Sequence, residues 1–258
     1  MPPARIVFWG MTLVALATSV RAVVGEPPTV AFVVAFSIAY AAMILCGVLI
    51  LRLRVFVDAM IEGPRGAKGV ALTFDDGPHP ETTLRALDAL DAAGAKATFF
   101  VIGKKAEAHP EVVRAIVDRG HAIGLHSYAH DRLFAMRGAA RWLDDLRRCR
   151  DVVEEITGER ARIFRPPIGH TVPHTPRVLR KLGLRVIGWS VSARDGVRSD
   201  AKTIESRILD GARDGSIVLL HDASERDTHE PAGVAALPAI LEGLAKKGLA
   251  VVPLSEWM

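Results

Sequence analysis

The sequence is poor in cysteine and has no long cluster of basic residues. Of its 258 residues only two are cysteines, and they lie in an apolar run (Cys46) and in a segment with helical periodicity (Cys149), which excludes a disulfide framework. A net charge of +4 would suit nucleic acid, but the basic residues are scattered. The pairs Arg147–Arg148 and Lys246–Lys247 are typical of solvated helix faces. We therefore expect no nucleic-acid partner.

Charge is absent from one stretch near the N-terminus. Residues 29–51 contain no charged side chain, and the stretch ends at Arg52. A run of this length can cross a hydrocarbon core about 30 Å thick, whereas a buried core helix of this length rarely lacks charge entirely. The pattern predicts a transmembrane helix over about 29–51. It follows a shorter apolar run, about 6–25, which contains Arg21 and is separated from it by Glu26-Pro27-Pro28.

The first apolar run has two interpretations. It is either a second transmembrane helix, with Arg21 reaching the membrane interface, or a signal peptide cleaved near Ala17-Thr18-Ser19. We favour two helices, which makes residues 1–60 a membrane segment with the lipid bilayer as a partner. Both interpretations return the chain to the cytoplasmic side, and Arg5, Arg52 and Arg54 at the outer ends agree with the positive-inside rule. We expect an integral protein of the inner membrane with residues 61–258 facing the cytoplasm.

From Gly69 onward, short β-branched runs alternate with longer amphipathic runs. This alternation predicts a parallel sheet with helices outside, and about seven strand–helix units favour a barrel or near-barrel. The expected strands are Val70–Phe74, Ala97–Ile102, Ala122–Leu125, Ile163–Arg165, Arg185–Trp189, Ile217–Leu220 and Ala250–Pro253. The expected helices are Glu81–Ala93, Pro110–Arg119, Gly138–Thr157, Thr175–Leu182, Ala201–Ala212 and Gly233–Lys247, most of them followed by a glycine suited to a C-cap.

Ionisable side chains follow the expected strands, where parallel α/β folds collect their chemistry. They are Asp75-Asp76, His126 to His130, Arg165 to Gly169, Asp195 and His221-Asp222. Because the carboxyl ends of parallel strands meet at one edge of the sheet, we expect these groups to converge. The two adjacent carboxylates repel each other in an apolar setting, and a bound cation would relieve that repulsion.

A metal site accounts for several of these residues together. His126 and His130, four residues apart, would point to one side if they lay on a helical turn, and Asp76 would complete a set of two histidines and one aspartate. Such a set leaves a position open and is typical of catalytic rather than structural zinc. Co²⁺, Ni²⁺ or Mn²⁺ could use the same ligands. Asp75 would then remain ionised and act as general base toward the metal-activated water.

Four further residues suit catalytic roles. Arg165 is a fixed positive partner for Asp75, although an ordinary buried salt bridge would look the same. Pro166-Pro167 would direct the amide of Ile168 toward a developing oxyanion. His221 ends an apolar strand and could protonate a leaving amine with Asp195 holding the imidazolium, the alternative being a satisfied core histidine.

These candidate residues, in the order in which they follow one another along the chain, resemble the motifs of the polysaccharide deacetylase family, or NodB homology domain. The motifs that carry the resemblance stand at Thr73–Gly77, His126–His130, Arg165–Gly169, Ser192–Gly196 and Leu219–His221, and the likeness covers about residues 68–258. The family fold is a distorted (β/α)₇ barrel, so the resemblance implies this fold for residues 61–258, preceded by the membrane segment.

The resemblance also implies roles for individual residues. Asp75 would be the base, Arg165 its partner, and His221 the general acid tuned by Asp195. The amide of Ile168 would help the metal to bind the oxyanion, Leu219 would line the pocket for the acyl methyl, and Pro167 and Gly169 would contribute to substrate binding. The implied metal ligands are Asp76, His126 and His130. The implied reaction is hydrolysis of an N-acyl group, usually acetate, from an amino sugar.

The chain departs from the family pattern at three positions. Ile168 stands where the family often has an aromatic residue, Ser192 replaces an aspartate, and Gly196 replaces a tryptophan that forms one wall of the usual pocket. We expect an N-acetylated polysaccharide or oligosaccharide as substrate. The alternatives are a polyprenyl-phosphate-linked amino sugar that loses acetyl or formyl at the membrane, an O-acetyl ester, and an inactive glycan-binding membrane protein. Retention of base, ligands and acid disfavours the inactive protein. The sequence does not indicate an oligomeric state.

Overall fold

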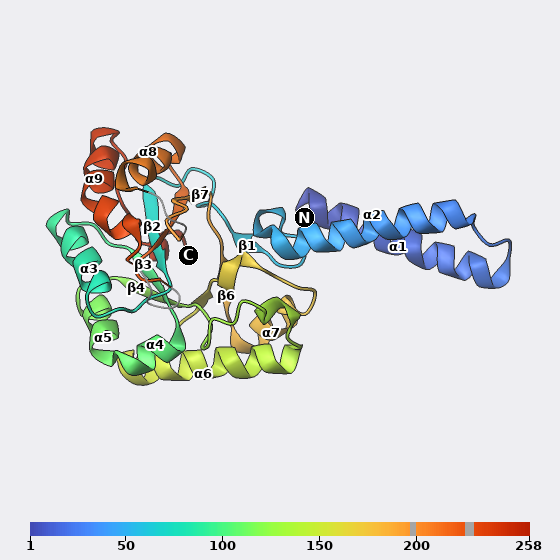
Figure 1. The fold of residues 1–258 in the computed structure, drawn as a ribbon, viewed down its shortest axis with the longest axis horizontal. Helices are drawn as coiled ribbons and strands as arrows, with labels where there is room; N and C mark the ends of the chain where they lie inside the picture. The colour runs from blue at the N-terminus through green and yellow to red at the C-terminus, as the bar shows by residue number, and fades with distance from the viewer. Residues whose placement is uncertain (197–199, 225–229) are drawn as a thin grey trace.

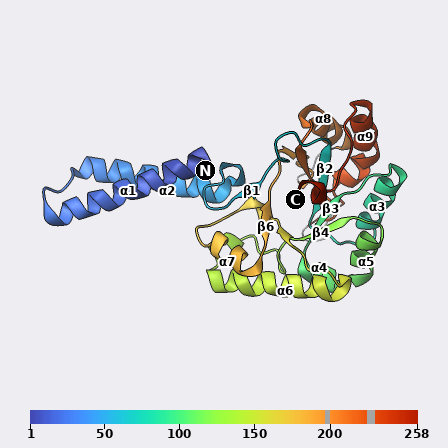
Figure 2. The same ribbon diagram turned by 180° about the vertical axis from the view of Figure 1, so that it is seen from behind.

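The computed structural model describes residues 1–196, 200–224 and 230–258. It consists of an N-terminal helical hairpin and a rounded α/β domain, and the hairpin projects from one side of this domain (Figures 1 and 2). The hairpin is formed by α1 (Pro3–Val24) and α2 (Val30–Leu49), joined by the turn that contains Glu26-Pro27-Pro28. The two expected apolar helices are thus present with shifts of a few residues at their ends.

A parallel sheet of eight strands forms the centre of the α/β domain. Its spatial order is β1-β6-β5-β4-β3-β2-β8-β7, and every pairing between neighbours is parallel. The sheet curls, and no pairing among the described residues joins the edge strands β1 and β7, so the barrel is open on that side. The strands are β1 (Ala59–Met60), β2 (Val70–Asp75), β3 (Thr98–Val101), β4 (Ala122–Leu125), β5 (Ile163–Phe164), β6 (Arg185–Ile187), β7 (Val191–Ser192) and β8 (Ser216–His221).

Amphipathic helices cover the outside of the sheet (Figure 1). The α-helices are α3 (Thr82–Ala92), α4 (Gly103–Ala108), α5 (Pro110–Asp118), α6 (Ala139–Thr157), α7 (Thr175–Leu182), α8 (Ala201–Gly211) and α9 (Ala232–Lys246). Short 3₁₀ turns lie at Leu51–Leu53, Phe134–Met136, Pro167–Gly169 and Leu254–Trp257. The expected glycine C-caps are confirmed at Gly158 and Gly183, whose φ angles of 72° and 65° require a residue that tolerates the left-handed region.

The distorted barrel expected from the sequence is confirmed, with local differences. Residues 250–253 form a single bridge, Val70 with Val251, rather than a strand, because Pro253 lacks a donor for the ladder and leads into the last 3₁₀ turn. The two-residue strands β1 and β7 and the short helix α4 were not expected, since segments this short show no periodicity.

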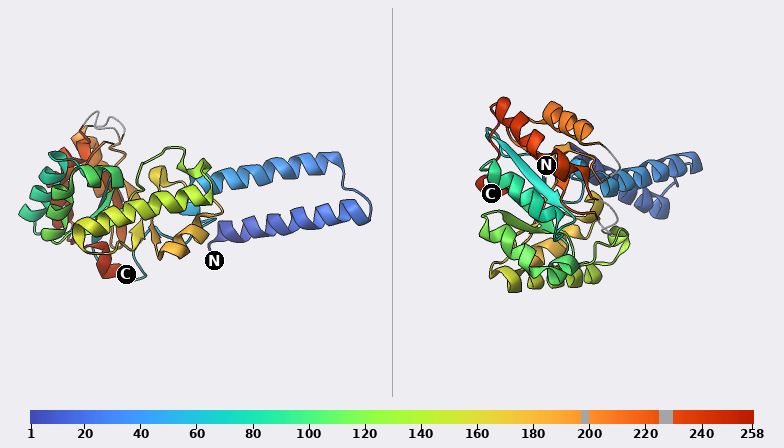
Figure 3. Two further views of the ribbon diagram at one scale, coloured as in Figure 1. Left: turned by 90° about the horizontal axis from the view of Figure 1, so that it is seen from below. Right: turned by 60° about the vertical axis from the view of Figure 1, so that its left-hand side comes forward.

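The base of the hairpin is held against the α/β domain. The guanidinium of Arg5 donates to the carbonyl oxygens of Arg54 and Val55 and lies 2.9 Å from Asp58. The amide of Thr171 donates to the carbonyl of Val48 at 3.2 Å. Both outer ends of the hairpin therefore lie at the α/β domain, while the connecting turn lies at the far tip (Figure 3).

Both hairpin helices are long and apolar enough to cross a membrane. Their side chains are almost entirely exposed: α1 contains no buried residue, and Gly47 is the one buried residue of α2. A helix hidden in a soluble core would be buried, so burial does not account for their apolar character. The same length and composition also fit a signal anchor.

Candidate active site

A pocket of about 490 Å³ lies at the carboxyl ends of the central strands. It is lined by residues from β2, β8 and the segments after β4, β5, β6, β7 and β8. The lining residues are Asp75, Asp76, His126, His130, Arg132, Ile168, Gly169, Trp189, Gly196, Leu219, His221, Ala223, Ser224 and Pro231. The ionisable groups that follow separate strands in the sequence thus share one pocket.

The two adjacent aspartates take different positions at the end of β2. Asp75 is the last residue of the strand and pairs in register with His221 at the end of β8. Asp76 has a φ of 72°, which turns the chain out of the strand direction. Both are buried, with 4% and 8% of their surface exposed. The change in backbone direction lets two like charges from neighbouring residues face different partners.

His126 and His130 do not lie on a helical turn, and that expectation was wrong. The segment after β4 is an irregular loop in which Ser127 and His130 have positive φ angles of 66° and 47°. Hydrogen bonds hold it in place: His130 donates its amide to Ser127 Oγ, and Asp145 of α6 accepts the amides of Tyr128 and Ala129. These contacts satisfy the loop backbone without helical hydrogen bonds. The two imidazole rings still meet, with centroids 4.9 Å apart.

Asp76, His126 and His130 form a compact set of metal-ligating groups. Oδ1 of Asp76 lies 3.4 Å from Nε2 of His126 and 3.2 Å from Nε2 of His130. Two ligands of one tetrahedral ion, each about 2.1 Å from it, are separated by roughly 3.4 Å. This oxygen is buried and has no hydrogen-bond partner. The donor set, the spacing and the orphaned oxygen therefore fit a divalent cation.

The local contacts also determine which nitrogen of His126 carries a proton and whether Asp76 is ionised. Nδ1 of His126 lies 2.8 Å from the carbonyl oxygen of Arg165, which can only accept, so Nδ1 carries the proton and Nε2 is left to face Asp76. Burial alone would raise the pKa of Asp76, but its interactions with the nearby histidines, His126 first and then His130 and His221, lower its pKa far below the usual value. Asp76 is therefore a carboxylate at neutral pH.

Arg165 is the fully buried partner of Asp75. Its Nη1 donates to Asp75 Oδ1 at 2.7 Å and to Thr73 Oγ1 at 2.8 Å. Nη2 donates to the carbonyl of Gly188 at 2.9 Å, and the guanidinium lies 4.2 Å from the centroid of Phe100. A buried arginine held by this many contacts has one orientation, so it fixes Asp75 and balances its charge.

His221, which lines the pocket, and Asp195 form a two-point contact. Asp195 accepts from Nδ1 of His221 at 2.8 Å and from its backbone amide at 2.9 Å. Burial by itself lowers the pKa of His221, but the hydrogen bond and charge of Asp195, followed by the charges of Asp76 and Asp75, raise its pKa to about 9. Gly233 packs on Asp195, where a β-carbon would lie 2.1 Å from Oδ2.

The remaining predicted residues line or support the pocket. Ile168 has a φ of 49° and its side chain lies at the rim, 48% exposed. Gly169 and Leu219 also line the pocket, whereas Pro167 is buried and is not among the lining residues. A β-carbon on Gly169 would lie 2.7 Å from the ring of Trp189, so glycine allows the indole to pack there.

Several residues at the site were not singled out from the sequence. Trp189 and Arg132 line the pocket. Trp189 was the last residue of an expected strand, and Arg132 lies two residues after His130. Neither position by itself indicates a role in a site. Asp145 holds the histidine loop from a helix that is distant in sequence. Asp222, which the sequence placed beside His221 without a role, is buried and accepts from Thr83, and its burial raises its pKa to about 7.

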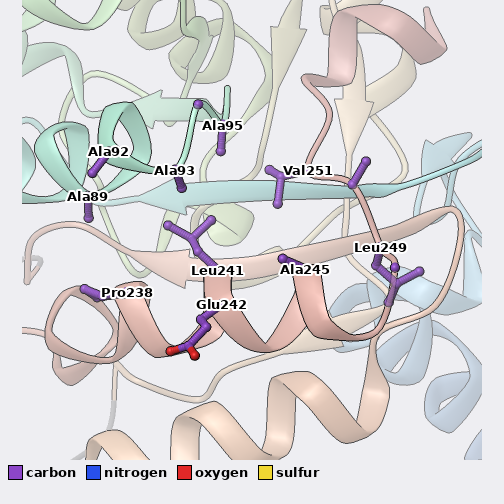
Figure 4. A pocket seen from close by; sticks show the side chains of 13 residues that line it. Ala89, Ala92, Ala93, Ala95, Pro238, Leu241, Glu242, Ala245, Leu249 and Val251 are labelled. Carbon is purple, nitrogen blue, oxygen red and sulfur yellow. The ribbon is translucent and has the colours of Figure 1, made fainter.

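A larger hollow, of about 720 Å³, lies between α3 and α9 (Figure 4). Its walls are mostly alanine, leucine and valine side chains, and Glu242 is the ionisable residue among those that line it. One carboxylate cannot supply a base, an acid and a cation site together. The chemistry therefore belongs to the smaller pocket at the strand ends.

Comparison with known proteins agrees with this geometry. Residues 62–187 match the family model described as polysaccharide deacetylase. A peptidoglycan-N-acetylglucosamine deacetylase of Bacillus cereus is 33% identical over 192 residues, which cover 74% of this chain and 69% of that protein. A chitooligosaccharide deacetylase of Azorhizobium caulinodans is 36% identical over 196 residues, covering 72% of this chain and 92% of the relative.

A solved structure shares the fold. The crystal structure of the Bc1960 peptidoglycan N-acetylglucosamine deacetylase superposes with a TM-score of 0.72 at 31% identity, covering 77% of this chain and 91% of that one. The likeness in sequence and in structure extends over about three quarters of the chain.

Proposed function

The chain belongs to the polysaccharide deacetylase family, and from that membership we propose that it is a metal-dependent hydrolase that removes the N-acetyl group from an amino sugar in a polysaccharide or oligosaccharide. The relatives named above act on peptidoglycan and on chitooligosaccharides. Both are glycans with N-acetylated amino sugars, which is the substrate class that we assign to this chain.

One observation carries the proposal: the base, the cation ligands and the acid share one pocket. Asp75, Asp76, His126, His130 and His221 all line it. A protein that had kept the fold only to bind glycans would have no need to retain every one of these groups in reach of the others. Their joint presence favours an active enzyme over an inactive glycan-binding protein.

Asp76, His126 and His130 are the residues proposed to hold the divalent cation, with Zn²⁺ as the first choice and Co²⁺, Ni²⁺ or Mn²⁺ as alternatives. When bound, such an ion acts as a Lewis acid on the acyl oxygen and makes water a better nucleophile near neutral pH. The remaining chemistry belongs to the side chains of the protein.

Asp75 is proposed as the general base. Arg165 holds its carboxylate in one orientation, so that the free oxygen can take the proton of the attacking water. The backbone amide of Ile168, at the pocket rim, is proposed to donate to the oxyanion that forms on the acyl carbon. Leu219 and Gly169, which line the pocket, would bound the space that receives the acyl methyl and the sugar, with the buried Pro167 behind them.

His221 is proposed as the general acid. Its raised pKa keeps the imidazole protonated at neutral pH, with the proton available at Nε2 because Nδ1 is engaged by Asp195. Transfer of that proton to the sugar nitrogen as the carbon–nitrogen bond breaks gives a free amine and acetate. An O-acetyl ester would need this proton less, because an alkoxide leaves more readily than an amide anion.

The domain division and the side of the membrane are part of the same proposal. Residues 1–60 would anchor the protein in the inner membrane, and residues 61–258 would carry the catalysis on the cytoplasmic face. Arg5, Arg52 and Arg54 lie at the end of the hairpin next to the α/β domain, whereas Arg21 lies near the far turn. Reporter fusions to the C-terminus should be active only for a cytoplasmic reporter; activity of a periplasmic reporter would contradict this.

The test of the function is acetate release by the full-length protein in detergent. We would use N-acetylglucosamine oligomers and measure release before chelation, after chelation, and after adding back Zn²⁺, Co²⁺, Ni²⁺ or Mn²⁺ separately. Release that is lost with chelator and restored by one metal supports the proposal. An O-acetylated xylan oligomer serves as the control for ester specificity. No release with any metal, from a folded protein, would refute N-deacetylation of these glycans.

A further inference from the structure

A second hollow, of about 680 Å³, adjoins the catalytic pocket. Ile168, Gly169 and Trp189 line both hollows, so the two spaces meet along this shared wall. The second hollow extends along β7 and the start of the segment that follows α2, so it reaches the base of the hairpin. A ligand longer than one sugar could therefore occupy both spaces.

The far end of the second hollow reaches the membrane hairpin. Leu49, the last residue of α2, and Ile50 line it, and their side chains are 48% and 46% exposed. The end of α2 is fixed to the α/β domain, because Thr171 donates to the carbonyl of Val48 and Gly47 packs closely against Phe56. An apolar surface at the level where the bilayer ends thus opens directly toward the catalytic pocket.

Between these two ends the hollow is lined by arginines. We call it the arginine cleft, after Arg52, Arg194, Arg207 and Arg213. None of the described residues that line it is acidic. Glu62, just outside the lining, lies 3.9 Å from Arg52 and forms an ion pair with Arg213. One carboxylate against four guanidinium groups leaves the arginine cleft with an excess of positive charge.

The side chains of these arginines differ in how they are held. Arg207 donates to the carbonyl oxygen of Ala193, which fixes its guanidinium beside β7. The side chains of Arg52 and Arg213 are 60% and 63% exposed, and so can meet a ligand. The planar guanidinium, with its paired N–H donors, matches the oxygens of a phosphate group.

We propose that the arginine cleft binds the phosphate group of an amphiphilic substrate. Its apolar chain would lie in the bilayer beside the end of α2, and its N-acylated sugar would enter the pocket of Asp75 and Asp76. The order of surfaces along the molecule, apolar, then cationic, then catalytic, matches the order of parts in a lipid phosphate that carries a sugar. The inference rests on the proposed N-deacetylation and names the class of substrate for it.

The test compares three N-acetylglucosamine derivatives with the full-length protein in nonionic detergent. They are the dodecyl phosphate ester, the neutral dodecyl glycoside, and the 1-phosphate without a chain. If the proposal holds, the dodecyl phosphate ester has a KM at least about tenfold below those of the other two, because charge-assisted hydrogen bonds to phosphate add to the contact of the chain. Equal KM values for the dodecyl phosphate ester and the neutral glycoside would overturn it.

Arginine variants locate the effect. The double substitution Arg194→Gln with Arg213→Gln should raise the KM for the phosphate ester about tenfold relative to the KM for the neutral glycoside. Arg114→Gln removes an exposed arginine from α5, away from the arginine cleft, and should leave the ratio of the two KM values unchanged. The same loss of preference in both variants would mean that net charge, and not the arginine cleft, attracts the ester, and would overturn the proposal.

Binding measured without turnover separates this proposal from the proposed function. Calorimetric binding of the dodecyl phosphate ester, lost in the double variant, supports the arginine cleft even if no derivative releases acetate, in which case only the deacetylase function fails. If the protein releases acetate from soluble oligomers but shows no preference for phosphate in KM or in binding, the proposed function is supported. Phosphate binding in the arginine cleft is then refuted. Displacement of the ester by phosphatidylglycerol vesicles at equal phosphate concentration would identify a phospholipid headgroup as the occupant and also overturn it.

Discussion

Soluble proteins usually bury apolar side chains and expose charged ones, and the hairpin and the catalytic pocket depart from this rule in opposite ways. In the hairpin, apolar side chains are exposed: Val23 is 85% and Ile38 66% accessible. In the pocket, charges are buried: Arg165 is fully inaccessible and Asp75 is 4% exposed. Each arrangement is unfavourable in water unless another partner compensates. For the hairpin we propose lipid as that partner, and for the pocket opposite charges or a cation.

The comparison shows that the two regions depend on different surroundings although they share one chain. If the hairpin lies in a membrane as proposed, it is stabilised by what lies outside the protein, and its sequence needs only to be apolar. The pocket is stabilised by partners that the fold brings from distant parts of the chain, as Arg165 and Asp75 illustrate, which lie 90 positions apart in the sequence. A single charge removed from the pocket should therefore matter as much as a single charge inserted into the hairpin.

The largest effect is expected for Asp75→Asn. The substitution removes the proposed base but keeps the size of the side chain, and we expect kcat/KM for acetate release to fall by about 10³-fold, in the range of general-base catalysis. Membrane insertion should not change, because the hairpin is untouched. Asp118→Asn, on the exposed face of α5, is the matched control. Activity of Asp75→Asn within tenfold of the parent would exclude Asp75 as the base.

Asp222→Asn tests a buried carboxyl group that the proposed reaction does not use. Its raised pKa means that the folded protein keeps this proton up to about pH 7, while the unfolded chain releases it near 3.8. The contribution of this group to the free energy of unfolding is therefore complete below about pH 4. It decreases as the pH rises from there through 7, a loss of roughly 4 kcal/mol.

The measurement is the melting temperature of metal-free parent and variant in detergent at pH 5 and pH 8. Because the asparagine side chain cannot ionise, the variant should gain several degrees relative to the parent between the two values. A difference in melting temperature that is the same at both pH values would show that Asp222 titrates normally. Asp118→Asn again serves as the control, since its side chain is exposed.

Ile38→Arg sharpens the comparison from the side of the hairpin. Ile38 lies in the middle of α2, and an arginine there should cost about 2.5–3.5 kcal/mol of insertion free energy in a bilayer. We expect a smaller membrane-bound fraction after cell fractionation. Met136→Arg, at a position 80% exposed on the α/β domain, should have no such effect. Unchanged insertion of Ile38→Arg would argue against α2 as a spanning helix.

The smallest effect is expected for Asp195→Asn, measured as a pH profile. Activity that needs protonated His221 is present below its pKa of about 9 and is lost as the pH rises through that value. Removing the carboxylate removes the largest raising contribution, so the alkaline limb of kcat/KM should move down by about one pH unit or more. An alkaline limb at the same pH in both proteins would mean that another group controls it.

Much of the site could be predicted because parallel strands end on one edge of the sheet. Once Val70–Asp75 and Ser216–His221 are recognised as parallel strands, Asp75 and His221 must lie at the same edge, and the register indeed pairs them. The partnership of Arg165 with Asp75, and the contact of Asp195 with His221, followed from charge and were confirmed as contacts.

Other features of the site could not be read from any local pattern. The helical turn expected at His126 to His130 is a loop, because Asp145 of α6 satisfies its backbone amides. Trp189 forms a pocket wall, and its indole packs against Gly169, which lacks a β-carbon. These positions result from packing between segments that are far apart in the sequence.

By itself, the sequence determined the properties that are local or periodic: the two apolar helices, the alternation of strands and helices, and the residue types available for catalysis. The length of an apolar run and its periodicity are properties of a single segment, so they can be recognised from the sequence of that segment alone. Only the tertiary structure decided the register of β2 with β8, the turn that joins two histidines to Asp76, and the meeting of the arginine cleft with the catalytic pocket. Those features depend on which distant segments pack together, and the free energy of that packing is a property of the whole fold.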